Sequence, residues 1–251
     1  MHLISETSSD GVIERTFAID DVTGVLWSPE SGPHGAPLVL MGHPGGLHKK
    51  ARGLVARAHR AVTVDGYTVA SIDAPGHGDR PRNAQDQHWV ADMLEARAAG
   101  RPLGPILAEY NGSLAERAVP EWRAVIDELQ ALPEIGAGAP IGYTGMTLAS
   151  AIGLPLVAVE PRITAAIFGG VFMYPALIEA AKQVTIPIEF LLPWDDAEIP
   201  RQHGLDLFDA FASTEKVLHA FPGGHHEVPE YMGDNSGRLF ARHLGRGVVP
   251  A

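Results

Sequence analysis

The chain contains no cysteine, which excludes disulfide bonds, thiolate chemistry and cysteine-based metal sites. Basic residues are also scarce: 19 Lys and Arg stand against 30 Asp and Glu, a formal net charge of -11 at pH 7. Binding to nucleic acid or to an anionic membrane requires clustered Lys and Arg, so neither partner is expected. No apolar run reaches the ~20 residues of a membrane-spanning helix. These absences favour a neutral or weakly charged small-molecule substrate.

What remains is an ordinary globular composition, with 45% hydrophobic and 20% charged residues among 251. That length fits one domain, which we assign to residues 1–251. The polar start, residues 1–10, has no apolar signal core, and a cytoplasmic location agrees with this pattern. The oligomeric state is not fixed by these features, and a homodimer stays open.

Short β-like runs alternate with helix-like segments, which predicts an α/β fold with a mostly parallel central sheet flanked by helices. The first two expected strands are assigned to an antiparallel edge. The expected strands cover residues 12–19, 23–27, 37–41, 67–72, 140–146, 163–168, 186–192 and 216–220. The expected helices cover residues 50–65, 87–99, 106–118, 121–131 and a segment from 148.

The connection over residues 79–120 is too long for a simple loop. It contains helix-like pieces and large side chains, and it follows a strand end, where α/β proteins bind ligands. We therefore predict that it forms a small helical lid, with a pair of ordinary surface helices as the alternative.

One strand-turn-helix carries a pattern of catalytic interest. The run Gly145-Met146-Thr147-Leu148-Ala149 matches the G-x-S-x-G nucleophile elbow, with threonine in place of serine and alanine in place of the second glycine. Taken alone, this five-residue match favours a simple N-cap role for Thr147, at the start of the following helix, over catalysis.

Two later strand ends supply an acid and a base in the chain order nucleophile, acid, base. Asp196 is the preferred acid because it precedes an Ile-Pro turn by a few residues, and Asp195 is the alternative. His225 is the preferred base because it matches a G-x-H spacing, and His226 is the alternative. The histidine pair lacks a third ligand at a persuasive spacing, so no metal is expected.

Together these motifs resemble the α/β-hydrolase superfamily, within its dienelactone-hydrolase-like and small-esterase branch. The resemblance covers nearly the whole chain. Its landmarks are Gly42-His43-Pro44-Gly45-Gly46-Leu47-His48-Lys49, Asp73-Ala74-Pro75-Gly76-His77-Gly78-Asp79-Arg80, the elbow, Trp194-Asp195-Asp196 and Gly223-Gly224-His225.

The resemblance implies a hydrolase for a carboxylic ester, lactone or thioester that works without a cofactor. Asp196 would orient His225, which would take the proton from Thr147 for attack on the carbonyl. The oxyanion would be held by the backbone N–H of Leu148 and by a second N–H from the His43 loop. Pro44 has no N–H, so the second donor is assigned to Gly45, with Gly46 next.

Threonine departs from the family pattern and leaves three interpretations open. A β-branched residue is strained at positive φ, and its methyl group crowds the line of attack. The chain is then a hydrolase with a slower or more selective nucleophile, or a cyclase, lyase or isomerase with His225 as base and Thr147 as hydrogen-bond donor. The third interpretation is a catalytically weak binding protein, or a chain in which serine has been replaced.

Four side chains near the motifs are candidates for substrate binding: His43, Trp89, Trp194 and Phe172. The three aromatic residues could form an apolar acyl pocket, with core packing as the alternative. For His43 the alternative is a role in bracing its loop.

Overall fold

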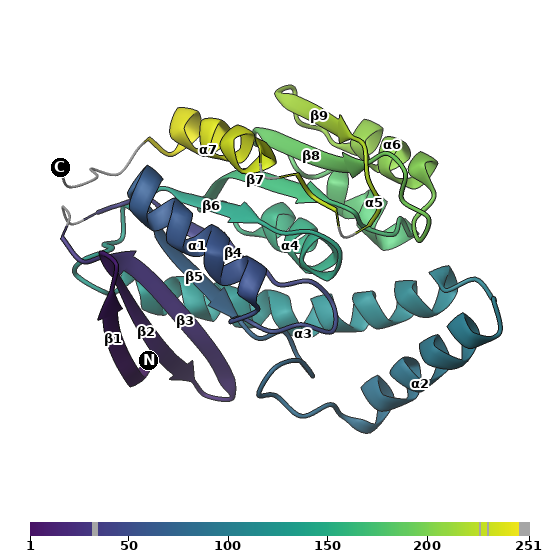
Figure 1. The fold of residues 1–251 in the computed structure, drawn as a ribbon, viewed down its shortest axis with the longest axis horizontal. Coiled ribbons are helices and arrows are strands. Elements are labelled where there is room, and N and C mark those ends of the chain that lie inside the picture. The colour runs from purple at the N-terminus through teal and green to yellow at the C-terminus, as the bar shows by residue number, and fades with distance from the viewer. Residues whose placement is uncertain (32–34, 226, 230, 246–251) are drawn as a thin grey trace.

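A mixed nine-stranded sheet forms the centre of the part of the chain that the structure describes (Figure 1). The computed structural model describes residues 1–31, 35–225, 227–229 and 231–245, with residues 232–236 described by their backbone alone. The strand order is β1-β2-β3-β5-β4-β6-β7-β8-β9. The strands are β1 (His2–Ser9), β2 (Val12–Ile19), β3 (Val22–Pro29), β4 (Leu38–Met41), β5 (Thr68–Ile72), β6 (Ile141–Thr144), β7 (Ile163–Gly169), β8 (Ile188–Pro193) and β9 (Lys216–Phe221). Strands β4 to β9 are parallel, which confirms the predicted sheet.

The sequence analysis missed the first strand. The antiparallel pairing of β2 with β3 is confirmed, but β1 lies outside β2 as the true edge. Every residue of β1 is exposed, so it has no apolar alternation to reveal it. The pair Asp10-Gly11 is the sequence signal for this strand, because Asp-Gly favours the tight turn of a β-hairpin. In the structure both residues have positive φ, 53° and 77°.

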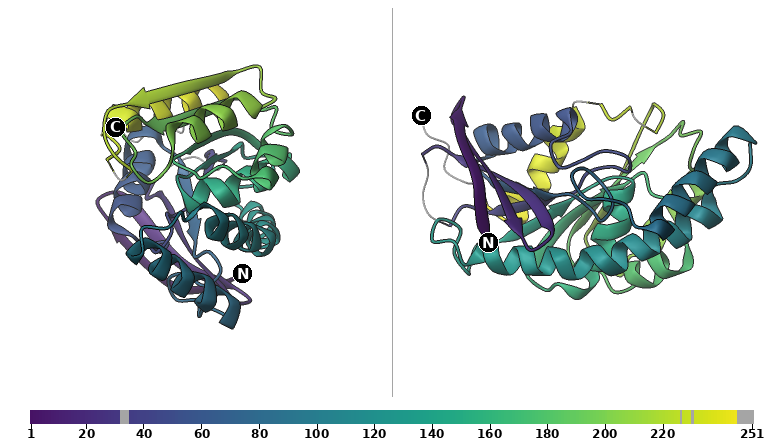
Figure 2. Two further views of the ribbon diagram at one scale, coloured as in Figure 1. Left: turned by 90° about the vertical axis from the view of Figure 1, so that its right-hand side faces the viewer. Right: turned by 90° about the horizontal axis from the view of Figure 1, so that it is seen from below.

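Helices cover both faces of the sheet, as Figure 2 shows end-on. The helices α1 (Arg52–Asp65) and α7 (Tyr231–His243) lie on one face. The other face carries α3 (Gly104–Gln130), α4 (Leu148–Val159), α5 (Pro175–Ala181) and α6 (Arg201–Ala210). Among the described residues, no helix has both the length and the apolar character needed to cross a membrane.

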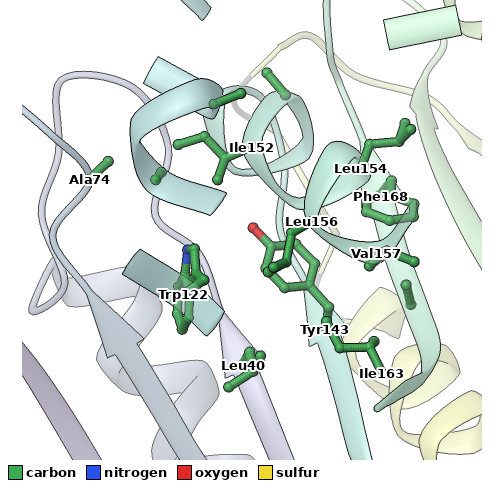
Figure 3. Close-up of a cluster of buried hydrophobic side chains, with 14 of the residues drawn as sticks. Leu40, Ala74, Trp122, Tyr143, Ile152, Leu154, Leu156, Val157, Ile163 and Phe168 are labelled. Carbon is green, nitrogen blue, oxygen red and sulfur yellow. The ribbon is translucent and has the colours of Figure 1, made fainter. Parts of the chain in front are cut away.

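The larger part of the core lies between the sheet and the layer that contains α3 and α4 (Figure 3). Trp122 from α3 packs edge-on against Tyr143 of β6, with ring centroids 6.2 Å apart. The Tyr143 ring also packs on Phe168 of β7. Burial of these large rings holds α3 against β6. The Tyr143 hydroxyl also donates to the Ala149 carbonyl at 2.6 Å, which ties α4, the helix after Thr147, to β6.

The segment predicted as a lid forms α2 (Ala84–Ala98) and the first half of α3, which project past the carboxyl ends of the strands (Figures 1 and 2). The predicted break between residues 118 and 121 is wrong, because α3 runs through Pro120 without interruption. Buried residues continue on both sides of the proline, among them Leu114, Ala118 and Trp122. Pro120 itself is exposed, so water can solvate the carbonyl that it leaves without a donor. Tertiary packing therefore outweighs the local helix-breaking signal.

Candidate active site

Thr147 lies at the sharp turn between β6 and α4, with φ 57° and ψ -117°. The predicted elbow and its positive φ are confirmed. The alternative of a simple N-cap is wrong, because the Thr147 side chain makes no capping hydrogen bond to the helix. A β-branched residue in this conformation costs ~1–3 kcal/mol, so the surrounding structure must hold it there.

Two features hold the turn. Ser150 is fully buried, and its hydroxyl oxygen lies 2.8 and 2.9 Å from the carbonyl oxygens of Gly145 and Gly169, which share its one proton, and accepts from the Gly169 N–H. The Thr147 N–H donates to the Gly169 carbonyl at 2.9 Å. A Cβ at Gly145 would lie 2.4 Å from the Ala149 Cβ, so strand and helix approach more closely than a larger residue would permit. This close contact is the physical reason for small residues on both sides of position 147.

Asp196 and His225 form a hydrogen-bonded pair, with Nδ1 of His225 2.8 Å from Oδ2 of Asp196. The other oxygen of Asp196 accepts the backbone N–H groups of Glu198 and Ile199, which fixes the carboxylate. Both side chains are largely buried. Asp195 instead accepts the N–H of Gly223 and braces the histidine loop. The alternative base, His226, lies outside the described residues.

His225 and Thr147 come together around Gly170, which also has positive φ (53°). A Cβ at Gly170 would lie 3.7 Å from Cγ2 of Thr147 and 3.9 Å from Cε1 of His225. The methyl group of Thr147 and the imidazole of His225 therefore both border Gly170. Its hydroxyl is buried and makes no hydrogen bond within the described part of the chain.

The two expected oxyanion donors are neighbours. A Cβ at Gly45 would lie 3.7 Å from Cβ of Leu148, and both residues line the same cavity as Thr147. Within the residues described, neither the Gly45 N–H nor the Leu148 N–H donates a hydrogen bond to the protein. Both are available to a ligand atom.

A cavity of about 430 Å³ joins these groups. Its volume falls in the ordinary range for small-molecule sites. Thr147, Leu148, Gly45, His225 and Phe172 all line it, and most of its remaining wall is apolar. The apolar lining residues are Pro44, Val90, Met93, Leu94, Leu103, Leu107, Val171 and Ile199. The helices α2 and α3 supply four of these eight side chains, and Leu103, directly before α3, supplies a fifth, so the segment 79–120 forms much of the cavity wall.

Three of the four side chains predicted to bind substrate lie elsewhere. His43 is 3% exposed, and its ring nitrogens contact the backbone of Pro44 and Ala74. Trp89 packs against Tyr110 on the lid and does not line the cavity. Trp194 is 42% exposed and lies under the guanidinium of Arg201. Only Phe172 lines the cavity, so the acyl-pocket prediction for the two tryptophans is corrected.

The sequence analysis missed several polar groups of the cavity. Arg97 on α2 forms an ion pair at 3.0 Å with Glu198, which follows the acid loop, and both line the cavity. Tyr110, Asn111 and Arg82 line it as well. Burial raises the pKa of Tyr110. No sequence motif marks these residues, because their roles depend on where the lid folds back.

Buried and half-buried ion pairs join α2 to α3 and join the loop after β5 to α3. Asp86 at the start of α2 is fully buried and accepts two bonds from Arg117 of α3, at 2.7 and 3.0 Å. Arg80 donates two bonds to Glu121 and a third to the Asp73 carbonyl. Such bidentate pairs fix direction as well as distance, so they set the angle of the lid over the strand ends.

The folded chain is similar to several solved esterase structures. A cold-adapted esterase from an Arctic intertidal metagenomic library, in complex with PEG, is 29% identical, with a TM-score of 0.76 over 97% of this chain and 100% of that one. An acetyl xylan esterase from Paenibacillus sp. R4 is 12% identical, with a TM-score of 0.70 over 97% and 88%. Est1E from Butyrivibrio proteoclasticus, bound to ferulic acid, is 13% identical, with a TM-score of 0.66 over 97% and 100%.

No protein-family model matches the chain, and no curated protein matches it in sequence. The similarity of this chain to known proteins is therefore its similarity to the solved esterase structures. The parallel strands, the elbow after β6 and the helices on both faces give this chain the α/β-hydrolase fold.

Proposed function

We propose that the chain is a carboxylic ester hydrolase that acts through Thr147, His225 and Asp196. The observation that carries the proposal is the 2.8 Å hydrogen bond between Asp196 and His225, beside the cavity that both His225 and Thr147 line. The 29% identity to a cold-adapted esterase over nearly the full length supports the reaction class.

The bonding pattern around His225 suits a general base. Because a carboxylate only accepts, the Nδ1 that faces Asp196 carries the proton, and Nε2 of the neutral ring is then unprotonated. Nε2 would take the proton of the Thr147 hydroxyl as its oxygen attacks the ester carbonyl. The C–O bond to the alcohol would then break, and the alcohol would leave with that proton. Water would release the acyl group by the same steps.

The substrate class follows from the cavity wall. An apolar acyl chain or aromatic ring would pack against Phe172 and the lid side chains, while the carbonyl oxygen would lie between Gly45 and Leu148. We therefore propose small to medium esters, with lactones and thioesters as further members of the same class. The lid over residues 79–120 would act as the cover of this site.

A second candidate rests on the hydroxyl group of Thr147. It is buried and makes no hydrogen bond in the described structure, so it is not bonded to His225. A cyclase, lyase or isomerase would need His225 only as a base toward the substrate. In that case Thr147 would act as a hydrogen-bond donor and form no covalent bond.

A screen of p-nitrophenyl esters of increasing acyl length tests the proposal. Wild type, Thr147→Ser and Thr147→Ala are compared, followed by intact-mass measurement after a fluorophosphonate probe. An adduct on Thr147, with no turnover by the alanine variant, supports covalent hydrolysis. An adduct only on the serine variant, with an inert wild type, contradicts it and favours the second candidate.

A further inference from the structure

The carbonyl of the peptide between Pro44 and Gly45 has two partners, the Leu47 N–H at 3.3 Å and, at a shorter distance, the side chain of His43. The described residues contain no cis peptide bond, and in a trans peptide the C=O and N–H groups point in opposite directions. Nδ1 of His43 lies 2.8 Å from the Pro44 carbonyl oxygen. A bond that holds this carbonyl on the side of the imidazole necessarily turns the Gly45 N–H away from it.

The His43 ring is itself fixed at its other nitrogen. Nε2 accepts the backbone N–H of Ala74 at 3.0 Å. Because the Pro44 carbonyl can only accept and the Ala74 N–H can only donate, the ring is the neutral tautomer with its proton on Nδ1. Burial lowers the pKa of His43 to about 4, which agrees with a neutral ring at physiological pH.

The surroundings of the ring leave one direction for the Gly45 N–H. His43 is 3% exposed and packs against His77 at 5.4 Å between ring centroids, with Asp73 and His48 as the other titratable groups nearby. Gly45, on the far side of its peptide, borders the cavity next to Leu148. Its N–H has no acceptor within the described structure. The group therefore points toward the cavity.

We propose that His43 is a positioning residue that aims the Gly45 N–H at the substrate oxygen by holding the Pro44 carbonyl. The role of that oxygen as an oxyanion rests on the proposed hydrolase function, whereas the orientation of the peptide does not. His43 itself does not touch the substrate.

Two isosteric substitutions separate aiming from mere structural support. In His43→Asn, the amide nitrogen can take the place of Nδ1 and keep the bond to Pro44. In His43→Gln, the amide oxygen can take the place of Nε2 and keep only the bond to Ala74. Both variants lose one backbone contact, so thermal unfolding should show similar losses of stability.

The kinetic expectation differs between the two variants. The substrate is p-nitrophenyl acetate, and both variants are made in the wild type and in the Thr147→Ser background. His43→Asn should keep most of the kcat of its parent protein. Gln should lower kcat about 100-fold or more at nearly unchanged KM, as expected when one oxyanion donor is lost. Equal losses in both variants, or a larger loss in Asn, would overturn the proposal.

A second readout keeps the test independent of hydrolysis. In ¹⁵N-¹H NMR spectra, the Gly45 amide resonance should stay near its wild-type position in His43→Asn and move in His43→Gln. The imidazole Nδ1–H should be visible at neutral pH in the wild type. If no variant hydrolyses any ester, the proposed function fails, while an unchanged Gly45 resonance in His43→Gln would contradict the positioning role itself.

Discussion

Replacing Thr147 by serine removes one methyl group from the most constrained position of the molecule. In the structure this methyl faces the space beside Gly170 and His225, while the hydroxyl is buried without a hydrogen bond in the described residues. For attack, the oxygen must come within hydrogen-bonding reach of Nε2 of His225, a bond that the described structure does not contain. Any rotation about χ1 that brings the oxygen there also carries the methyl group into a new position against its neighbours.

The size of the effect follows from this rotation. A side chain forced about 30° from a staggered rotamer costs ~0.5–1.5 kcal/mol, and a β-branched residue at φ 57° has few low-energy rotamers to choose from. Serine has no second heavy substituent on Cβ, so it avoids most of this cost. Relief of roughly 0.5–1.5 kcal/mol in the barrier corresponds to about a 2- to 13-fold higher rate.

The assay is steady-state hydrolysis of p-nitrophenyl acetate and butyrate by wild type, Thr147→Ser and Thr147→Ala. We expect Thr147→Ser to raise kcat and to leave KM nearly unchanged, because the methyl group hinders the reacting geometry more than it hinders substrate binding. The alanine variant controls for background hydrolysis by His225 alone. It should show neither turnover nor an acyl-enzyme burst.

An unchanged or lower kcat in the serine variant would refute this reasoning. It would mean that the methyl does not hinder attack, or that the hydroxyl is not the nucleophile. Alanine activity near that of wild type would show that Thr147 forms no covalent bond, and the non-hydrolytic candidate would then be preferred.

Three further predictions concern the acid, the cavity wall and the acid stability of the fold. Asp196→Asn should abolish most turnover while Asp195→Asn retains most of it, because Asp196 bonds to the base whereas Asp195 bonds to the Gly223 N–H; equal losses in ester assays would contradict this. Gly104→Ala should raise KM severalfold, because its Cβ would lie 2.5 Å from the phenylalanine ring of the cavity wall. The control Gly112→Ala on the same helix meets no atom within 4 Å and should raise unfolding free energy by about 0.5–1 kcal/mol; the same KM change in both would reject the steric argument. The bonds from Arg162 lower the pKa of Glu160 from 4.5 to about 2, so its stabilising effect is full above pH 4.5 and is lost as pH falls toward 2. In Glu160→Gln, the free energy of unfolding measured with urea should fall less between pH 4.5 and pH 2 than it does in the wild type. An equal fall in both proteins would show that this carboxylate contributes nothing.

Much of the fold could be predicted from the sequence because its signals are local. Buried parallel strands are short continuous apolar runs, and β4, β5, β7 and β8 were all found within two residues of their ends. The elbow was found because the close approach of strand and helix requires small residues at fixed spacing around Thr147. The choice of Asp196 over Asp195 agrees with its bond to His225, since the spacing to the Ile-Pro turn reflects the loop geometry.

Other features depended on contacts between distant segments. The continuity of α3 through Pro120 comes from packing against β6 and α4, which no local pattern reveals. The positions of His43 and Trp194 away from the cavity depend on how the loops turn at the strand ends. The position of Trp89 depends on which face of α2 packs against α3. The pairing of Arg97 with Glu198 joins positions 101 residues apart.

The sequence by itself thus determined the order of strands and helices and the types of residue at the strand ends. Apolar runs, small residues and turn signals act over a few neighbouring positions. Only the tertiary structure decided the rotamer of Thr147, the direction of the Gly45 N–H and the wall of the cavity. Each of these results from side chains of separate elements that compete for the same space.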